Sequence, residues 1–376
     1  MKFTIEQSKL VDVVNWVSRS LSTRPIQTAL LGIVIDAEGS KVVLSGSDLE
    51  TASRATTDAE VATSGKVLVP GKLLADISRS LPNKPVTIQL DGTRVLVNAG
   101  SAKFTLPVLP INEYPNLPEM PEALGTIDAD LFNQAVAQVS TAAGKDDSLP
   151  SLTGVHVEVN GENITMAATD RYRLAVRELT FSPARPNTEA VALVRARTLH
   201  DAAKTLATAK NVNIALAPAS SNDRLAGFQT DTKSTTTRLL DGTFPPYRHL
   251  LPQESLTTTV IEVAPFLDAV RRVALVTDKT IPLKLTFTGN TVTLEAGGGD
   301  EAQANEVFEI NKTGEDLSIA FNPNYLLDGL HAISAPYAQI SFNTSSKAAI
   351  LMGKVDANAA AVDNFRYLLM PTKFAY

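Results

Sequence analysis

The residue types that most often carry out chemistry are sparse in this chain, and they form no familiar catalytic pattern. Cysteine is absent, and no two of the four histidines stand at the spacing that a zinc site uses. The sequence also lacks the Gly-x-Ser-x-Gly turn of a serine nucleophile and the Gly-x-x-x-x-Gly-Lys-Ser/Thr loop that binds phosphates. We therefore expect surface or packing roles for the histidines, which are His156, His200, His249 and His331.

Two short segments could bind an ion, but a plainer explanation fits both. Residues 297–300 read Gly-Gly-Gly-Asp after a strand pattern, yet no helix pattern follows to supply a phosphate-binding N-terminus. Asp146 and Asp147 stand beside a lysine in a segment typical of a solvated loop. We expect no catalytic residue, no metal and no cofactor, which favours a binding protein or scaffold. An enzyme with a carboxylate site around Asp170 is the weaker alternative.

The composition is that of an ordinary globular protein. The 376 residues include 34 Lys and Arg against 40 Asp and Glu, a formal net charge of -6, and 44% are hydrophobic. The acidic total argues against a protein that is basic overall, but it does not fix how charge is distributed. No apolar run reaches the roughly 18–20 residues of a membrane helix, and the first residues lack the apolar region of a signal peptide. We expect a cytoplasmic protein of two or three domains, without a membrane role.

One pattern of elements occurs three times along the chain. Each third begins with an amphipathic helix pattern, continues with a strand–turn–strand pattern around a glycine, and later shows a second helix pattern. Val69, Val194 and Phe321 end equivalent strands and are 125 and 127 residues apart. The expected first helices span 10–21, 131–139 and 266–274, the hairpins 33–44, 155–166 and 283–294, and the second helices 73–81, 199–206 and 325–333.

This repeat predicts an α+β fold of three like domains, each with two helices packed on antiparallel sheets of about eight strands in all. Proline-containing segments typical of linkers occur at 110–121 and at 251–252. The predicted domains are therefore 1–120, 121–253 and 254–376.

Several motifs, taken together and in order, resemble one family. They are MKFT at 1–4, SDLE at 47–50, ATDRYRLA at 168–175, DGTFPPY at 241–247 and YLLMP at 367–371. This set resembles the bacterial DNA polymerase III beta subunits, the sliding clamps, over essentially the whole chain. In that family frame, we expect Asp170 to hold a turn at a strand end through hydrogen bonds to the backbone.

The resemblance implies a non-catalytic processivity subunit of DNA polymerase III holoenzyme. Two copies of the three clamp domains would close as a head-to-tail homodimeric ring around double-stranded DNA, without sequence preference. The alpha subunit of the polymerase, the clamp loader, other DNA polymerases and repair proteins would dock through short linear peptides. The alternative that stays open is a repeat-built protein-interaction scaffold without a direct DNA role.

The resemblance also implies a groove for partner peptides between the second and third domains. Its deep apolar part would use Leu152, Thr169, Arg171, Tyr172, Arg173, Leu174, Pro245, His249, Leu250, Leu368 and Met370. Its shallower entrance would use Asn322, Tyr325, Ser346 and Lys373. Without the resemblance, Leu174, Leu250 and Leu368 would be taken for core residues. Tyr172 stands where relatives often have histidine, and Lys373 where some have arginine, so peptide preference is expected to differ.

Two further surfaces follow from the same resemblance. The helices would line the hole of the ring, and weak contacts to phosphates would allow sliding. The residues expected at DNA are Arg24, Lys72, Arg79, Arg197 and Lys204. For any one of them an ordinary solvated helix face is at least as good an explanation. The residues expected at the dimer interface are Lys103, Phe104, Leu106, Ala274, Leu275 and Glu301.

Overall fold

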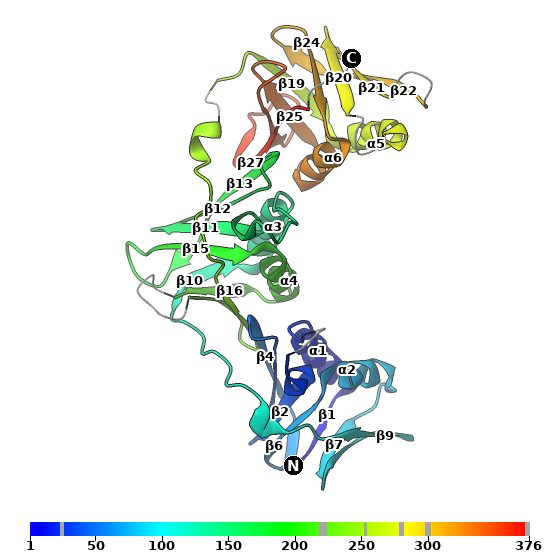
Figure 1. Cartoon of the computed structure of the whole chain (residues 1–376), viewed down its shortest axis with the longest axis vertical. Helices are drawn as coiled ribbons and strands as arrows, with labels where there is room; N and C mark the ends of the chain where they lie inside the picture. Colours follow the sequence, from blue (N-terminus) through cyan, green and yellow to red (C-terminus); the bar gives the residue numbers. More distant parts are fainter. Residues whose placement is uncertain (23–25, 218–223, 252–253, 278–281, 298–301, 373–376) are drawn as a thin grey trace. The chain divides into compact units, whose positions relative to one another are not determined.

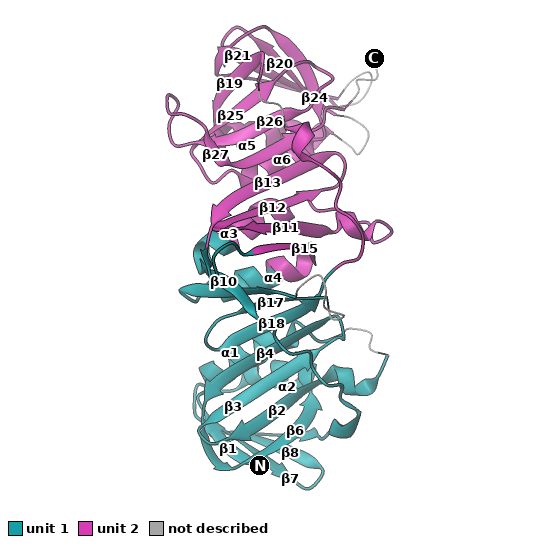
Figure 2. Ribbon diagram, turned by 90° about the vertical axis from the view of Figure 1, so that its left-hand side faces the viewer, with its two compact units in different colours: residues 1–132, 182–188, 201–239 teal, residues 133–181, 189–200, 240–376 magenta. Residues whose placement is uncertain are grey.

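The computed structural model describes residues 1–22, 26–217, 224–251, 254–277, 282–297 and 302–372. The chain forms two compact units, coloured separately in Figure 2. Unit 1 comprises residues 1–132, 182–188 and 201–239, and unit 2 comprises residues 133–181, 189–200 and 240–376. In the described part of the chain, no helix combines the length and apolar character needed to cross a bilayer.

Unit 1 contains two antiparallel sheets. The smaller has the strand order β5-β1-β7-β8-β9, and the larger has the order β14-β10-β16-β17-β18-β4-β3-β2-β6. The hairpin predicted at 33–44 is β2–β3, in which Ile35 pairs with Leu44. The bounds are β1 Lys2–Ile5, β2 Gly32–Glu38, β3 Lys41–Ser47, β4 Thr51–Asp58, β5 Glu60–Thr63, β6 Gly65–Pro70, β7 Val86–Asp91, β8 Arg94–Ala99, β9 Ala102–Pro107, β10 Ala123–Asp128, β14 Ser182–Pro183, β16 Asn211–Leu216, β17 Leu225–Gln229 and β18 Lys233–Arg238.

Two helices of unit 1, α1 (Gln7–Ser18) and α2 (Gly71–Ser80), lie side by side and pack on the strands (Figure 1). Their apolar residues recur at helical spacing, so one face of each helix is buried. In α1 this face includes Leu10, Val14 and Val17. The indole of Trp16 is also buried, and its Nε1 donates to the carbonyl of Arg54 at 3.0 Å. Helix α1 ends at Ser18, three residues before the predicted end.

Unit 2 repeats this plan with a nine-stranded sheet, ordered β15-β11-β12-β13-β27-β26-β25-β19-β23, and a four-stranded sheet, ordered β22-β21-β20-β24. The hairpins predicted at 155–166 and 283–294 are β11–β12 and β20–β21. The bounds are β11 Gly154–Asn160, β12 Asn163–Thr169, β13 Arg173–Thr180, β15 Glu189–Arg195, β19 Thr257–Glu262, β20 Leu283–Thr288, β21 Thr291–Ala296, β22 Ala304–Glu309, β23 Asn311–Thr313, β24 Leu317–Phe321, β25 Tyr337–Phe342, β26 Ala349–Lys354 and β27 Val362–Leu369.

The remaining helices are α3 (Ala129–Ser140), α4 (Ala196–Leu206), α5 (Val263–Val273) and α6 (Pro323–Ala332). Helix α6 begins with a proline in its first turn, and the side chain of Asn322 caps it by accepting from the backbone N of Asn324 at 3.0 Å. Its Gly329 allows the buried ring of Tyr367 to approach, because a Cβ there would lie 2.4 Å from that ring. The missing side chain of Gly329 therefore allows β27, the last strand, to pack closely against α6.

The threefold repeat is confirmed, with two helices and nine described strands in each third of the chain. Neighbouring thirds share sheets, because β4 pairs with β18 and β13 pairs with β27. The middle third therefore contributes strands to both compact units. The boundaries at 120/121 and 253/254 remain a prediction from the repeat.

Candidate functional site

A tight turn joins β12 to β13 and begins the site. The Asp170 carboxylate accepts from the backbone N of Tyr172 and of Arg173, at 3.1 Å each, as predicted for this residue. The hydroxyl of Thr169 donates to the carbonyl of Arg173 at 2.6 Å. Arg171 has a φ of 81°, a left-handed conformation that costs a non-glycine residue energy and that these hydrogen bonds maintain. The turn therefore fixes the directions of Tyr172 and Arg173.

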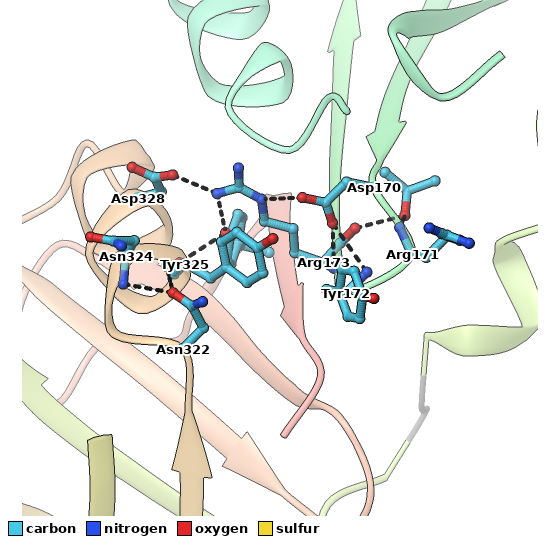
Figure 3. A network of polar contacts seen from close by, with 10 residues as sticks. Asp170, Arg171, Tyr172, Arg173, Asn322, Asn324, Tyr325 and Asp328 are labelled. Atoms are coloured by element: carbon cyan, nitrogen blue, oxygen red, sulfur yellow. Dashed lines mark hydrogen bonds and ion pairs between the residues drawn. The ribbon is translucent and has the colours of Figure 1, made fainter. Parts of the chain in front are cut away.

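The Arg173 side chain links this turn to α6 and to the last strand (Figure 3). It is only 4% exposed. Its Nε donates to Asp170 at 3.0 Å, and its Nη1 donates to Asp328 of α6 at 2.5 Å and to the Tyr367 hydroxyl at 3.3 Å. The guanidinium also lies 4.3 Å from the ring centre of Tyr325. A buried arginine needs such compensation, so these partners hold one another in place.

Tyr367 forms the base of this network. Its ring is fully buried in unit 2, and its hydroxyl donates to the carbonyl of Tyr325 at 2.9 Å. Burial raises the pKa of Tyr367, although Arg173 opposes the rise. The hydroxyl is therefore neutral and remains a donor at any physiological pH.

Around the network lies a cavity of about 650 Å³, formed within unit 2. Six of the predicted peptide-binding residues line it, namely Leu152, Arg171, Tyr172, Arg173, Asn322 and Tyr325. The others, which the sequence reasoning did not assign to a groove, are Ala143, Gly144, Lys145, Asp146, Leu149, Asp170, Asn324 and Asp328. The acidic pair at 146–147 is the only local signal for this wall in the sequence, and it predicts a solvated loop. Asp146 is indeed exposed and accepts from the backbone N of Ser148 at 2.9 Å.

Two tyrosines give the cavity an aromatic wall. The rings of Tyr172 and Tyr325 stack with centres 6.2 Å apart and planes 25° from parallel. Tyr172 is 54% exposed, and the Arg171 guanidinium lies 6.0 Å from its ring centre. Its carbonyl accepts from the backbone N of Met370 at 2.8 Å, so the backbone of Met370 lies next to the turn, although this 41% exposed residue does not line the cavity. Six of the fifteen predicted residues, from three distant parts of the sequence, thus line one cavity.

The apolar residues predicted for the deep part of the groove are mostly buried. Leu174 and Leu368 are paired across β13 and β27 and belong to a core cluster with Val176, Phe244 and Tyr247. Because side chains alternate along a strand, they face the side of the sheet opposite to Arg173 and Tyr367, and neither lines the cavity. Of the other predicted residues, Thr169 and Pro245 are partly buried and His249, Leu250 and Ser346 are exposed, and these five do not line the cavity. Lys373 lies outside the described residues.

His156 of β11 supports the segment that leads to the groove. Its ring stacks on Phe244 with centres 5.1 Å apart, and its Nε2 lies 3.8 Å from the Glu158 carboxylate. Arg248 donates to the same carboxylate at 2.8 Å. Burial lowers the pKa of His156; Glu158 opposes this and Arg248 adds to it. This histidine is a packing residue, as expected from the sequence.

The residues predicted at DNA are exposed on their helices wherever the structure describes them. Lys72 lies on α2, and Arg197 and Lys204 lie on α4. Arg79 of α2 is also exposed, but it is paired with Asp76 at 2.5 Å. Arg24 lies outside the described residues. Within the described ranges, no group of three or more His, Asp or Glu residues converges as ligands for a metal.

The residues predicted at the dimer interface lie in two places. Lys103 and Phe104 are exposed on β9, at an edge of the five-stranded sheet, whereas Leu106 of that strand is fully buried. Leu275 is 84% exposed in the 3-10 turn Ala274–Val276 that follows α5, and Ala274 is partly buried there. Glu301 lies outside the described residues.

Comparison with known proteins gives one consistent result along the chain. The N-terminal, central and C-terminal domains of the DNA polymerase III beta subunit match residues 1–118, 126–246 and 248–372. The chain is 48% identical over 375 residues to the beta sliding clamp of Streptomyces coelicolor, covering 100% of both chains. It is 42% identical over 374 residues to the beta sliding clamp homolog GriR of Streptomyces muensis, again covering 100% of both. The crystal structure of a DnaN sliding clamp from Pseudomonas aeruginosa bound to griselimycin is similar over 100% of both chains, with a TM-score of 0.91 and 26% identity.

The Arg173 network predicts a large loss of stability for Arg173→Lys, although this substitution keeps the positive charge. In Arg173→Lys, one ammonium group cannot satisfy Asp170 and Asp328 with the same geometry, so the free energy of unfolding should fall by about 2–4 kcal/mol. Arg177→Lys is the matched control, because Arg177 is also buried on β13 but, among the described residues, its side chain bonds only to Asn364. Urea unfolding should give the control a loss of about 1 kcal/mol or less. Equal losses would show that the network has no special role.

The depressed pKa of His156 predicts a pH dependence of stability. As the pH falls below the ordinary value of 6.5, the unfolded chain takes up the proton first, so stability is complete above that pH and decreases toward the folded-state pKa. Urea unfolding at about pH 7.5 and pH 5.5 should show a larger loss in wild type than in His156→Phe, which keeps the stacking on Phe244. An equal or smaller loss in wild type would contradict this assignment.

Proposed function

The chain belongs to the family of DNA polymerase III beta subunits, the beta sliding clamps, and we propose how its surfaces serve that function. Two copies close head to tail as a ring around duplex DNA, and the cavity at the β12–β13 turn binds short peptides of the polymerase alpha subunit, the clamp loader and other client proteins. The ring then keeps a bound polymerase on its template. The observation that carries this function is the match of all three family domains in order along the chain.

The groove assignment is supported by chemistry as well as by family membership. An exposed aromatic ring, an adaptable thioether at Met370 and the amide of Asn322 offer an extended peptide both apolar contact and hydrogen bonds. Because Arg173 already has its partners, we infer that it shapes the site and leaves direct contacts to Tyr172, Tyr325 and Arg171. Leu174 and Leu368 pack together in the core and hold β13 against β27.

The ring proposal is supported by two of the eight strands that end the four described sheets. Strand β9 ends the five-stranded sheet of unit 1, and β22 ends the four-stranded sheet of unit 2. Open edges invite pairing with another chain. Exposed apolar side chains accompany both edges, with Phe104 on β9 and Val307 on β22. We propose that β9 of one copy meets β22 of the other, with Leu275 at the margin of the contact.

DNA contact is proposed for the exposed helix cations Lys72, Arg79, Arg197 and Lys204, and for Arg24. Phosphate contacts of this kind are weak, salt-dependent and independent of sequence, as sliding requires. Arg79 would have to exchange its contact with Asp76 for a phosphate. We further propose that the chain performs no catalysis of its own and acts in the bacterial cytoplasm with the replication machinery.

Retention on DNA tests the function. Protein loaded by the clamp loader should remain on a circular plasmid through gel filtration and should leave the same plasmid once it is linearised. Leu275→Asp, which puts a charge at the proposed interface, should lower the retention on circles and the dimer fraction in native mass spectrometry. Equal retention of wild type on circles and linear DNA would indicate ordinary binding, and no retention with intact peptide binding would favour the scaffold alternative.

Peptide binding tests the groove separately. Met370→Ala removes an exposed apolar contact beside Tyr172, so the affinity for a polymerase clamp-binding peptide should fall about tenfold, with the dimer mass unchanged. Leu256→Ala is the matched control, because Leu256 is an exposed apolar residue of unit 2 whose backbone N bonds to Phe342 of β25 and not to the β12–β13 turn. Normal peptide affinity of Met370→Ala in calorimetry would mean that the groove is wrongly assigned.

A further inference from the structure

The two junctions between neighbouring thirds of the chain are built from different side chains. At the second junction, β13 with β27, each of the five paired positions includes a buried apolar or aromatic residue, namely Leu369, Leu174, Tyr367, Val176 and Phe365. At the first junction, residues 51–55 of β4 pair with residues 233–237 of β18. These five pairs consist only of serine, threonine, alanine, lysine and arginine. We refer to them as the seam.

Polar contacts connect the two sides of the seam. The Ser53 hydroxyl lies 3.0 Å from the Thr235 hydroxyl, and Lys233 donates to Asp12 of α1 at 2.7 Å. Opening the seam would return these groups to water, which replaces most of the lost hydrogen bonds. Large apolar side chains resist such opening, because water must then hydrate their surface. The seam therefore holds the first and second thirds together less firmly than the second junction holds its neighbours.

The segment that connects β9 to β10, residues 108–121, is anchored on one side of the seam by Tyr114. Its side chain packs against Val34 and Leu68, which face one another across β2 and β6. Burial raises the pKa of Tyr114 to about 12, and the backbone of Ser47 at the end of β3 opposes the rise. This aromatic anchor therefore lies beside the last residue of β3. The segment runs on the side of the sheet that faces away from α1 and α2 (Figure 1).

A second anchor, Met120, lies on the other side of the seam. A Cβ at Gly227 of β17 would be 2.0 Å from the sulfur of Met120, so the methionine occupies the space that a side chain would need. Phe228, the next residue, faces the helices, because its ring packs on Phe132 of α3 with centres 5.6 Å apart. Gly227 therefore faces the outer side of the sheet.

One row of directly opposite residues crosses four strands of this outer face. The row is Ser47, Ala52, Thr236 and Gly227. The first three are 2%, 7% and 5% exposed, although small side chains on an outer face are normally open to water. The row spans three strand spacings, about 14 Å, which the chain from 114 to 120 can cross. The segment therefore passes over the seam and covers it.

The second junction is covered in a different way. There Phe244 and Tyr247 of the next linker share one apolar core with Leu174 and Leu368 of the paired strands. The first segment instead meets small side chains at the seam, and its apolar anchors lie on either side. It bridges the seam and does not fill it.

We propose that the seam is the hinge of the chain, and that residues 108–121 are a strap that limits its opening. Bending at the seam moves the first third relative to the second and leaves the second junction intact. In the proposed ring, this motion lets the first third swing outward during loading onto DNA, and that use of the hinge rests on the proposed function.

Hydrogen exchange of the full-length protein, followed by mass spectrometry, tests the hinge without DNA or a partner. Amides of 51–55 and 233–237 should exchange at least about tenfold faster than those of 173–177 and 365–369. Equal or slower exchange at the seam would refute the hinge.

Two variants test the strap at its separate anchors. Tyr114→Ala and Met120→Ala should each speed exchange at the seam several-fold and leave exchange at the second junction unchanged. Ile111→Ala is the matched control, because Ile111 is an apolar residue of the same segment that is exposed, and it should exchange like wild type. If neither anchor variant changes exchange at the seam, the strap is refuted.

A disulfide across the seam tests the use of the hinge. Ser53→Cys combined with Thr235→Cys places two thiols opposite one another in a chain that has no other cysteine. The oxidised protein should load onto a circular plasmid several-fold more slowly than wild type, and reduction should restore the rate. Equal loading of both redox forms would refute the hinge motion in the ring while the proposed function stands. If wild type itself does not load, the proposed function fails, and the exchange measurements still decide the hinge and the strap.

Discussion

The candidate groove depends on how one buried charge is compensated. Removing a guanidinium from water is costly, and Arg173 is accommodated because Asp170, Asp328 and Tyr367 satisfy its donors. These partners lie on the β12–β13 turn, on α6 and on the last strand. Satisfying the charge therefore fixes the positions of three segments that are far apart in sequence. The stacked tyrosines lie on two of these segments, and the backbone N of Met370 bonds to the first.

A second constraint comes from the sheets. Neighbouring thirds of the chain share sheets through β4–β18 and β13–β27, so their internal edges are satisfied by hydrogen bonds. In the described part of the chain eight strands still end the four sheets, and β9 and β22 are two of them. Within one chain, neighbouring thirds join by pairing their edge strands. A head-to-tail dimer closed through β9 and β22 would pair edge strands between chains in the same way. The net charge of -6 is compatible with DNA inside such a ring, because sliding needs only local cations and gains nothing from strong attraction.

The sequence was sufficient to predict features that depend on local periodicity. The β2–β3, β11–β12 and β20–β21 hairpins follow from the alternation of apolar and polar residues on both sides of a glycine turn. The turn at Asp170 follows because aspartate side chains often accept hydrogen bonds from backbone N–H groups two or three residues later. The role of Arg173 was not predictable in this way, since its partner Asp328 is 155 residues away and carries no local signal. The cavity wall at 143–149 and the unpaired hydroxyl of Tyr247 likewise arise only from tertiary packing.

The central claim is that client peptides bind in a groove whose walls Arg173 holds together. A crystal structure of the full-length protein with a bound polymerase peptide tests this most directly. We predict that the peptide lies against Tyr172, Tyr325 and Met370, while Arg173 keeps its contacts with Asp170 and Asp328. A peptide bound elsewhere, or an Arg173 side chain turned away from both carboxylates to bind the peptide, would contradict the account.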